Sequence, residues 1–522
     1  MKNAVGREIP DELIAQGWEP FQGNAYRDGY EYKKAGPRVR SQVSRRESKV
    51  VSSLREAIEK SGLKDGMTIS FHHHFRDGDY IVDMVMRQIA EMGFRDIKLA
   101  TTSIGAAADI VADYIEEGIV TGLTTSGIRA RIGEVVSQGK LKEPAIIRTH
   151  GGRIRAIETG ELHIDIAFIG APSSDEYGNA SGKGGKNNCG GLAYSVADAH
   201  YADTVIVVTD TLVPFPNKPC TIEGIDVDYV VVVDAIGNAK KIASAAARIT
   251  SDPRELAIAE SCVDVIAATP YFKDGFNYQT GVGGPSIATL LFLKDKLQEK
   301  QITINSFIGG ISTPMVQMME EGFVRTIADT QDFDLKAIES FGSTPRHFEI
   351  SCSEYANPMN KGAFVNKLDF VVLSALEVDT SFNVNVITGS DGILRGAPGG
   401  HPDTAAGANV CIIVTPLVRG RMPTICDEVV TVTTPGDSVD VVVTDYGVAI
   451  NPKRQDLIDA VKAAGIELMT IQELRDIAYS IVGTPDKVQF KDKIVAIIEA
   501  RDGTVMDVVR EIKPYTFDDE TV

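Results

Sequence analysis

The chain has 522 residues, of which 43% are hydrophobic and 24% are charged, the balance of an ordinary globular protein. This length exceeds what one hydrophobic core normally serves, so we expect two or three domains. The formal net charge of −19 argues against nucleic acid and anionic membrane surfaces as partners, although a local cationic pocket can still bind an anionic substrate.

The six cysteines are scattered and form no CxxC pair, a pattern typical of reduced thiols in a cytosolic protein. The N-terminal sequence MKNAVGREIPDELIAQ lacks the apolar stretch of a secretory signal. No apolar run reaches the roughly 18 residues that a membrane span needs. We therefore expect a cytoplasmic protein without a transmembrane segment.

Residues 1–44 are polar and show no clear period, so we expect an arm that packs on the body or on a partner. After this arm, short β-branched runs alternate with amphipathic stretches. A helix is predicted over 80–92, between the first two of the predicted strands, and a strand–helix–strand order favours parallel α/β units. The strands are predicted at 67–71, 97–100, 164–169, 204–209 and 229–234.

An internal repeat divides the chain. Asp165-Ile-Ala-Phe-Ile-Gly-Ala recurs as Asp369-Phe-Val-Val-Leu-Ser-Ala, and four further matches follow the same order at separations of 204 to 209 residues. A period this long indicates a duplicated domain. We predict two homologous open α/β domains, residues 45–250 and 251–522, arranged as a pseudo-symmetric pair with the site in the cleft between them. The strands and the helices at 454–464 and 471–482 after Pro423 are expected to complete the second domain.

The first motif is His72-His73-His74-Phe75-Arg76. Neighbouring residues on a strand point to opposite faces, so at most His72 and His74 could share a metal, and no spaced Cys or carboxylate completes a set. We therefore expect no metal there. By the repeat, this stretch corresponds to a glycine turn of the second half, which predicts that His72, His74 and Arg76 line the cleft.

The second motif follows the strand that begins at Asp165. A polar turn with Asp175, Glu176 and Asn179 precedes a glycine-rich stretch that carries Lys183, Lys186 and Asn187. Lysines among glycines suit a carboxylate or a phosphate, so substrate binding is one interpretation. A flexible surface loop is the other.

The third motif is Thr280-Gly281-Val282-Gly283-Gly284-Pro285-Ser286, before a predicted helix at 287–297. Glycines let a backbone approach a ligand closely, and the N-terminus of a helix favours negative charge. The turn can therefore cradle an oxyanion or an acyl group, or it can be a plain strand-to-helix connection. It does not match the G-x-G-x-x-G fingerprint of nucleotide-binding folds.

The fourth motif runs from Ala375 through a glycine-rich loop at 389–403. Gly399 and Gly400 can cradle an anion, while Arg395 and His401 can pair with carboxylates. A loop of this length and composition is more typical of a functional segment than of a simple connector. Neither a Gly-x-Ser-x-Gly elbow nor a Walker lysine loop is present, which disfavours serine catalysis and nucleotide hydrolysis.

These motifs together resemble the CoA-transferase superfamily, and within it the alpha subunits of bacterial citrate lyase. The resemblance runs from about residue 45 to the end, and it implies two domains with the open α/β fold of CoA transferases. The matching segments are HHHFRDGD, IGAPSSDEYGNASGKGG, TGVGGPS, ALEVDTSFNVNVITGSDG, GAPGGHPDTAAGA and VTTPGDSVDVVVTDYGVA.

The resemblance implies exchange of the acetyl group on a carrier thioester for citrate, which gives citryl thioester and acetate. The carrier thiol would belong to a phosphoribosyl-dephospho-CoA group on a gamma subunit, the acyl carrier protein, and acetyl-CoA could replace it. No cofactor would be bound covalently to this chain. A beta subunit would cleave the citryl thioester, and a homodimer or larger oligomer is expected.

One departure from the superfamily concerns its catalytic glutamate, whose expected position falls at about Phe307. The resemblance then implies direct attack by a citrate carboxylate and a mixed anhydride. Cations must hold the carboxylate, with Arg76, Lys183, Lys186, Arg395 and His401 as candidates. Backbone amides of Val282, Gly283, Gly284, Gly309 and Gly310 are the expected oxyanion donors.

Two alternatives remain open at this point. Glu377, in a cleft-facing motif by the repeat, could be the nucleophile of a CoA transferase or acyl-CoA hydrolase that acts on small acids, or it could be a structural carboxylate. The chain could also be a non-catalytic effector-binding or scaffold protein on a related fold.

Overall fold

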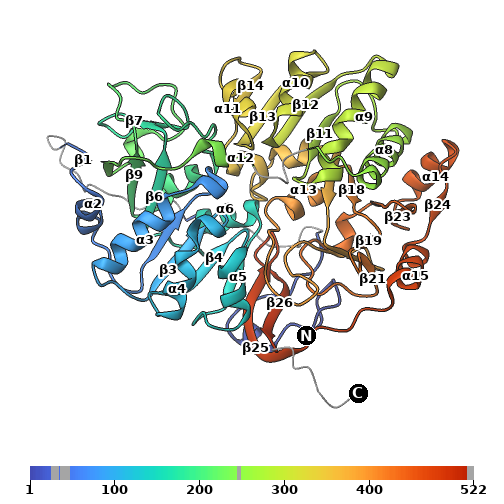
Figure 1. The fold of residues 1–522 in the computed structure, drawn as a ribbon, viewed down its shortest axis with the longest axis horizontal. Coiled ribbons are helices and arrows are strands. Elements are labelled where there is room, and N and C mark those ends of the chain that lie inside the picture. Colours follow the sequence, from blue (N-terminus) through green and yellow to red (C-terminus); the bar gives the residue numbers. More distant parts are fainter. Residues whose placement is uncertain (25–33, 36–47, 244–248, 514–522) are drawn as a thin grey trace.

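A computed structural model describes residues 1–24, 34–35, 48–243 and 249–513. Two large sheets with helices around them make up this part of the chain, and Figure 1 shows the first half in blue to green beside the second half in yellow to orange. The strands form because β-branched runs such as Thr204–Thr209 are buried on both faces of a parallel sheet. The predicted α/β class is confirmed.

The first sheet has ten strands among the described residues, in the order β1-β10-β9-β6-β2-β3-β4-β5-β25-β26. Its central members are mutually parallel, from β10 to β5. The strands are β1 (Val50–Val51), β2 (Thr68–Phe71), β3 (Ile97–Thr101), β4 (Val120–Thr125), β5 (Ala145–Ile147), β6 (Ile166–Ala171), β9 (Thr204–Thr209), β10 (Tyr229–Val232), β25 (Phe490–Glu499) and β26 (Val505–Ile512).

The second sheet has nine strands in the described chain, in the order β14-β13-β12-β11-β15-β18-β22-β23-β24. Only the pairing of β22 with β23 is antiparallel. The strands are β11 (Asn277–Thr280), β12 (Ile304–Ile311), β13 (Val324–Asp332), β14 (His347–Glu349), β15 (Phe370–Ser374), β18 (Val410–Val414), β22 (Val441–Val443), β23 (Val448–Ile450) and β24 (Leu468–Met469).

The two sheets repeat one topology. The order β10-β9-β6-β2-β3-β4-β5 of the first sheet corresponds strand for strand to β22-β18-β15-β11-β12-β13-β14 of the second. The repeat found in the sequence therefore reflects a duplicated parallel sheet. Short strands outside the two large sheets form small separate sheets: β7 (Ser173–Ser174), β8 (Ala180–Ser181), β16 (Glu377–Asp379), β17 (Val384–Asn385), β19 (Val418–Arg419), β20 (Met422–Pro423) and β21 (Ile425–Cys426).

Helices connect the strands, and several begin at a side-chain cap. Ser53 Oγ accepts a hydrogen bond from the amide of Glu56 at the start of α2, for example. The α-helices are α1 (Asp11–Ala15), α2 (Leu54–Ser61), α3 (Ile81–Glu91), α4 (Ile110–Glu116), α5 (Ala130–Ser137), α6 (His150–Thr159), α7 (Val196–Tyr201), α8 (Pro253–Ala268), α9 (Gly284–Lys300), α10 (Thr313–Glu320), α11 (Leu335–Ser340), α12 (Cys352–Ala356), α13 (His401–Gly407), α14 (Gln455–Ala463) and α15 (Ile471–Val482). Within the described residues, no helix combines the length and the apolar character needed to cross a bilayer.

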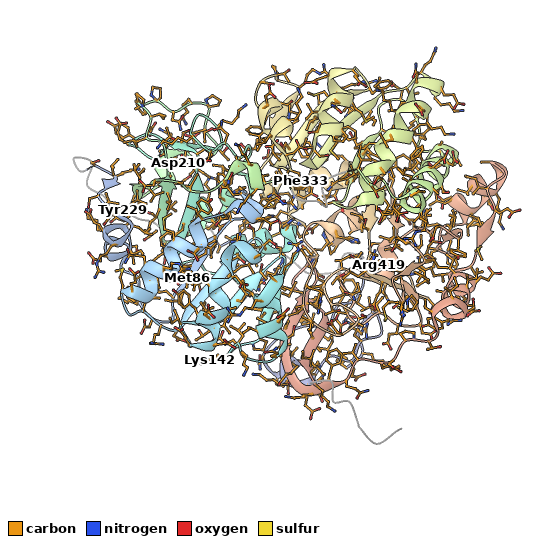
Figure 2. All side chains as sticks on the ribbon, viewed as in Figure 1. Met86, Lys142, Asp210, Tyr229, Phe333 and Arg419 are labelled. Atoms are coloured by element: carbon orange, nitrogen blue, oxygen red, sulfur yellow. The ribbon has the colours of Figure 1, made fainter. Side chains whose placement is uncertain are left out.

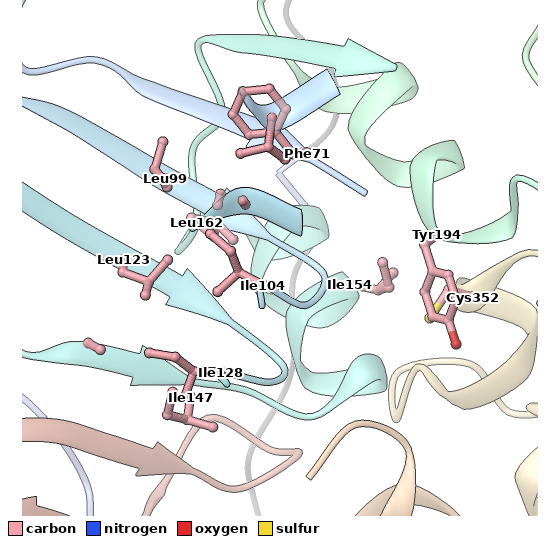
Figure 3. Packing of buried hydrophobic residues seen from close by; sticks show 14 of the residues in the cluster. Phe71, Leu99, Ile104, Leu123, Ile128, Ile147, Ile154, Leu162, Tyr194 and Cys352 are labelled. Carbon is pink, nitrogen blue, oxygen red and sulfur yellow. The ribbon is translucent and has the colours of Figure 1, made fainter. Parts of the chain in front are cut away.

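One hydrophobic core is shared by both halves. On β15, Val371 and Leu373 join the residues of the first sheet, whereas Phe370 and Val372 face a second cluster on the other side of their sheet. Figure 3 shows part of the shared core, from Phe71 on β2 to Cys352 on α12. This common core fixes the orientation of the two halves relative to each other. A site built from residues of both halves requires such a fixed orientation.

The C-terminal hairpin belongs to the first sheet. Strand β25 pairs in parallel with β5, and Figure 1 shows the red hairpin against the first half. Buried Glu499 accepts hydrogen bonds from Arg148 (2.9 Å) and Arg155 (3.2 Å). The expectation that the residues after Pro423 complete only the second half is wrong for β25 and β26, because the edge of β5 offers them free pairing positions. The domain division at residue 250 stays a prediction.

The described part of the N-terminal arm packs on this hairpin. Ile9 and Leu13 contact Ile494, Ile497 and Val505 in a small apolar cluster. The amide of Phe21 donates to the carbonyl of Val505 at 3.0 Å. The rest of the predicted arm lies largely outside the described residues.

Candidate functional site

A cavity of ≈ 850 Å³ opens between the two halves. Its walls come from the segments that follow the carboxyl ends of β2, β3 and β4 in one sheet and of β11, β12, β13 and β15 in the other. Open parallel sheets characteristically bind ligands at this end of their strands. Of the predicted site residues, the cavity is lined by His72, Arg76, Val282, Gly310, Arg395, Gly399, Gly400 and His401.

In the histidine run after β2, His72 and His74 are buried and His73 is partly buried. The Nε2 atom of His72 lies 3.3 Å from Asp198, whose carboxylate accepts two hydrogen bonds from Arg153 (2.8 and 2.7 Å). Burial lowers the pKa of His74 to about 3, with the neighbouring His72 as a second cause. His74 is not among the lining residues, whereas His73, which the sequence analysis passed over, is. Burial also lowers the pKa of His73, so this residue supplies an uncharged imidazole to the cavity lining.

Four arginines line the cavity: Arg76, Arg129, Arg395 and Arg419. The guanidinium of Arg76 stacks over the ring of Phe333 at 4.8 Å, and Arg395 pairs with Asp391 of its own loop. Burial lowers the pKa of Arg76 and Arg129, but an arginine stays protonated at any physiological pH. An acidic protein thus has a locally cationic hollow, and Figure 2 labels Phe333 and Arg419 in its walls.

Two carboxylates, Asp77 and Asp79, also line the cavity. Asp79 Oδ1 accepts hydrogen bonds from the amides of Ile81 (2.9 Å) and Val82 (3.1 Å) at the start of α3. Burial raises the pKa of Asp79 to about 7. Because four guanidinium groups face two carboxyl groups, one of them engaged with a helix start, the balance of charge favours an anionic ligand with several carboxylates.

Glycine turns bring main chain to the cavity wall. Val282 and Gly310 line it, and Gly283 and Gly284 begin the helix α9, whose first amides have no partner within the helix. A Cβ atom on Gly310 would lie 2.1 Å from the ring of Phe333. Gly309, at φ +99°, leaves no room for a side chain beside Gln279. These positions therefore require glycine for close packing at the cavity.

The loop before α13 crosses to the first half. Its Gly399 donates its amide to Ser126 (3.0 Å) and accepts from the amide of His150 (2.9 Å). Buried Asp403 accepts from the amide of Gly151 (2.9 Å) and so caps α6 from across the boundary. The loop thus fixes Gly399 and Gly400 against the first half, in the cavity wall.

His401 lines the cavity but is not a cation. Its Nδ1 lies 2.8 Å from Thr434 Oγ1, and its Nε2 lies 3.2 Å from the carbonyl of Ser374. Burial lowers the pKa of His401 to about 4. The expectation that His401 pairs with a carboxylate as a cation is therefore wrong at neutral pH, because the ring is desolvated and both nitrogens have protein partners.

This burial predicts a pH-dependent effect of His401→Gln. The unfolded chain takes up a proton at His401 below about pH 6.5, whereas the folded chain keeps the ring neutral down to about pH 4. Between pH 7.5 and pH 5, the free energy of unfolding of the wild type should therefore fall by about 2 kcal/mol relative to that of the variant. The slope is about 1.4 kcal/mol per pH unit where only the unfolded chain is protonated. Urea denaturation of both proteins at several pH values measures this difference.

His200→Gln is the matched control, because the hydrogen bond that His200 donates to the carboxylate of Asp226 raises the pKa of His200. The imidazolium of His200 stabilises the fold at low pH, and this contribution is lost as the pH rises. The wild type should therefore gain stability relative to His200→Gln as the pH falls, the opposite of the change expected for His401→Gln. Parallel pH profiles for the wild type and His401→Gln would contradict the prediction.

Several predicted site residues lie away from the cavity lining. Lys183 Nζ donates to the carbonyls of Glu339 (3.3 Å) and Phe341, because the last carbonyls of α11 attract a cation. Asn187 Nδ2 donates to Asp210 at 2.9 Å, and Lys186 lies in the same loop. Lys183, Lys186 and Asn187 were expected to bind substrate together with the cationic residues of the cavity. They do not line it, and Lys183 instead contacts the end of α11.

Glu377 is also absent from the lining, although Ser374, Ala375 and Leu376 contribute to it. Glu377 Oε2 accepts hydrogen bonds from Asn385 Nδ2 (2.8 Å) and from the amide of Val430 (3.0 Å). The first contact joins β16 to β17, and the second holds β16 to the segment that follows β21. This arrangement is typical of a structural carboxylate.

Sequence reasoning missed further polar residues of the cavity, among them Gln279, Tyr355 and His150. Gln279 Nε2 donates to the hydroxyl of Tyr355 at 2.7 Å. The ring of His150 lies 4.7 Å from that of Tyr194, and burial lowers the pKa of His150 to about 3. A glutamine inside the strand Asn277–Thr280 was the one available signal, because a buried polar residue there needs a partner.

Comparisons with known proteins agree on one family. The family model described as "Citrate lyase, alpha subunit (CitF)" matches residues 47–512. The citrate lyase alpha chain of Haemophilus influenzae is 50% identical over 468 residues, which are 90% of this chain and 94% of the relative. A 4-hydroxybutyrate coenzyme A transferase of Clostridium kluyveri is 28% identical over 312 residues, 55% of this chain and 66% of that protein.

A solved structure is also similar: an alpha subunit of citrate lyase from Streptococcus mutans, in complex with citrate. Its sequence is 51% identical, its TM-score is 0.95, and the match covers 98% of this chain and 100% of that one. Both halves described above therefore have counterparts in that protein.

Proposed function

Because the chain belongs to the family of citrate lyase alpha subunits, we propose that it exchanges the acetyl group of an acetyl thioester for citrate, giving citryl thioester and acetate. The thioester is carried by a gamma subunit, the acyl carrier protein, or by CoA. A beta subunit then cleaves the citryl thioester. The thioester is a substrate, and the chain itself holds no covalent cofactor.

The cationic cavity between the halves carries this proposal. Citrate brings three carboxylates, and four arginines line the hollow, with the N-terminus of α9 beside them. Guanidinium groups bind carboxylates through paired, charge-assisted hydrogen bonds. A volume of ≈ 850 Å³ accommodates citrate together with the end of a thioester arm.

The reaction proceeds by direct attack. A carboxylate oxygen of citrate attacks the acetyl carbonyl, and the tetrahedral oxyanion accepts hydrogen bonds from amides of the glycine turns. The C–S bond breaks, so the thiolate leaves and an acetyl–citryl anhydride remains. The thiolate then attacks the citryl carbonyl, and acetate departs with the bridging oxygen. No net proton transfer is required, which suits a site in which burial keeps His73, His150 and His401 uncharged.

The lining supports this route over a glutamyl enzyme. Phe307, at the position where the superfamily has its glutamate, is fully buried in β12 and contributes nothing to the wall. Glu377 is held by two donors outside the lining. Enclosure matters as well, because an anhydride exposed to water hydrolyses.

Oxygen transfer in a single turnover tests the proposal. Purified chain, acetyl-CoA and citrate labelled with ¹⁸O in its carboxylates should give citryl-CoA and acetate that carries ¹⁸O in the first turnover. A glutamyl enzyme would release a first acetate with the oxygen of the protein instead. Absence of any exchange with a competent carrier thioester would favour a binding or scaffold protein.

Glu377→Gln separates the same alternatives by mutation. The amide oxygen of glutamine can still accept a hydrogen bond from Val430, so we expect kcat within about threefold of the wild type. Loss of a true nucleophile would lower kcat by several orders of magnitude. The measurement is the steady-state rate of citryl-CoA formation, together with hydroxylamine treatment of the acylated protein. Modification of Glu377 by hydroxylamine in the acylated wild-type protein would reveal a glutamyl thioester and would refute direct attack by citrate.

A further inference from the structure

A second cluster of ionisable side chains lies outside the cavity, at the carboxyl end of β13 and on the neighbouring strand β14. Asp329, Asp332 and His347 are each at most 1% exposed, and one ligand atom from each lies within 4.8 Å of the other two. Gln331 and Phe333, on either side of Asp332, line the cavity. The cluster therefore backs the wall of the site without forming part of it.

Existing hydrogen bonds orient all three side chains. His347 Nδ1 lies 2.9 Å from Ser340 Oγ, and its Nε2 lies 3.0 Å from Asp329 Oδ2. The other oxygen of Asp329 accepts from the amide of Gln331 at 2.7 Å. Asp332 Oδ2 accepts from the amide of Gly191 at 3.1 Å. Metal-binding histidines commonly have their second ring nitrogen held in this way.

One atom of the cluster is unsatisfied. Asp332 Oδ1 is buried, and no hydrogen-bond partner contacts it among the described residues. A buried carboxylate oxygen without a donor, beside a second buried carboxylate, is electrostatically costly unless a cation, or a proton shared by the two carboxyl groups, neutralises the pair. The first half closes the position, since a Cβ atom on Gly190 would lie 1.6 Å from the other oxygen of Asp332.

We propose that Asp329, Asp332 and His347 bind one divalent cation, which fixes the 182–191 loop of the first half against β13 and β14 of the second. Two carboxylates and one imidazole suit Mn²⁺ or Zn²⁺ better than the softer metals that thiolates select. The cation is structural, because its ligands do not line the cavity. This inference does not depend on the proposed acetyl–citryl exchange.

The experiment uses the whole chain, purified without metal-affinity resin and in citrate-free buffer, since citrate chelates divalent ions. After EDTA treatment and its removal, Mn²⁺ is titrated and followed by EPR, and Zn²⁺ is titrated against a chromogenic chelator. We expect one of these ions to bind once per chain and to raise Tm by at least about 2 °C. Failure of both ions to bind would overturn the proposal. The two carboxyl groups would then be neutralised by a proton that they share.

Variants locate the bound ion. Asp332→Asn keeps an oxygen for the amide of Gly191 and should lower the affinity for the ion by at least about tenfold, and His347→Gln should do the same. The control is His163→Gln, which alters the partly exposed cluster of His163, Asp165 and Asp203 and should leave binding unchanged. Loss of binding in His163→Gln alone, or unchanged binding in Asp332→Asn, would contradict the assignment.

Discussion

Replacing Arg129 by Met should lower kcat/KM for citrate by about 100-fold, with little change in KM for acetyl-CoA. Arg129 lines the cavity as an exposed residue, although desolvation by the surrounding wall lowers the pKa of its guanidinium. Its removal leaves a bound carboxylate without its partner in a partly desolvated site, at a cost of about 3 kcal/mol. Methionine keeps most of the volume of the side chain, so packing changes little.

Arg131→Met is the matched control two residues further on. Arg131 pairs with Asp113 and lies 3.6 Å from Glu116, on the exposed side of α5 and away from the cavity. Exposed ion pairs contribute little, so this variant should keep its activity. Initial rates with varied citrate and varied acetyl-CoA measure both variants. An equal loss in the two, or a loss confined to KM for acetyl-CoA, would remove Arg129 from the citrate site.

Gly283→Val should lower kcat by at least about 100-fold while the protein stays folded. A Cβ atom at this position would lie 2.5 Å from Ser374 Oγ, which itself pairs with Ser286 Oγ at 2.7 Å. The valine must displace the turn that starts α9, and with it the amides proposed to hold the oxyanion. Loss of one such donor typically costs about 3–4 kcal/mol in the barrier.

Gly362→Val is the control for this change, since a Cβ atom there meets nothing within 4 Å. Both variants are assayed for citryl-CoA formation, and their thermal unfolding shows whether each is folded. Near-normal turnover by Gly283→Val would exclude its turn from the site. An equally large loss in Gly362→Val would show that the assay reports general damage.

Local patterns predicted the elements well. Helix α15 (Ile471–Val482) and strand β9 (Thr204–Thr209) have the predicted bounds, and the predicted helix at 80–92 is α3 (Ile81–Glu91). Such segments are set by hydrophobic period and by caps that lie within a few residues. The repeat, which is also readable along the chain, predicted the shared topology of the two sheets.

The candidate site was predicted only in part. Arg76 and Arg395 were expected in the cavity and line it, whereas Arg129 and Arg419 line it with no signal in their neighbourhood. Lys183 looked equally suited from its glycine-rich context but turns to the last carbonyls of α11. Residue type and local composition do not reveal which cation meets which partner, because that partner is distant in the chain.

The sequence alone therefore determined the α/β class, the duplication and the glycine turns, all of which depend on contacts over short stretches or on comparison of the chain with itself. Only the tertiary structure decided that β25 and β26 return to the first sheet, that His401 is desolvated and neutral, and that Asp329, Asp332 and His347 converge. These features arise from pairing and burial between residues far apart in the chain, and the free energy of such contacts depends on the whole packed molecule.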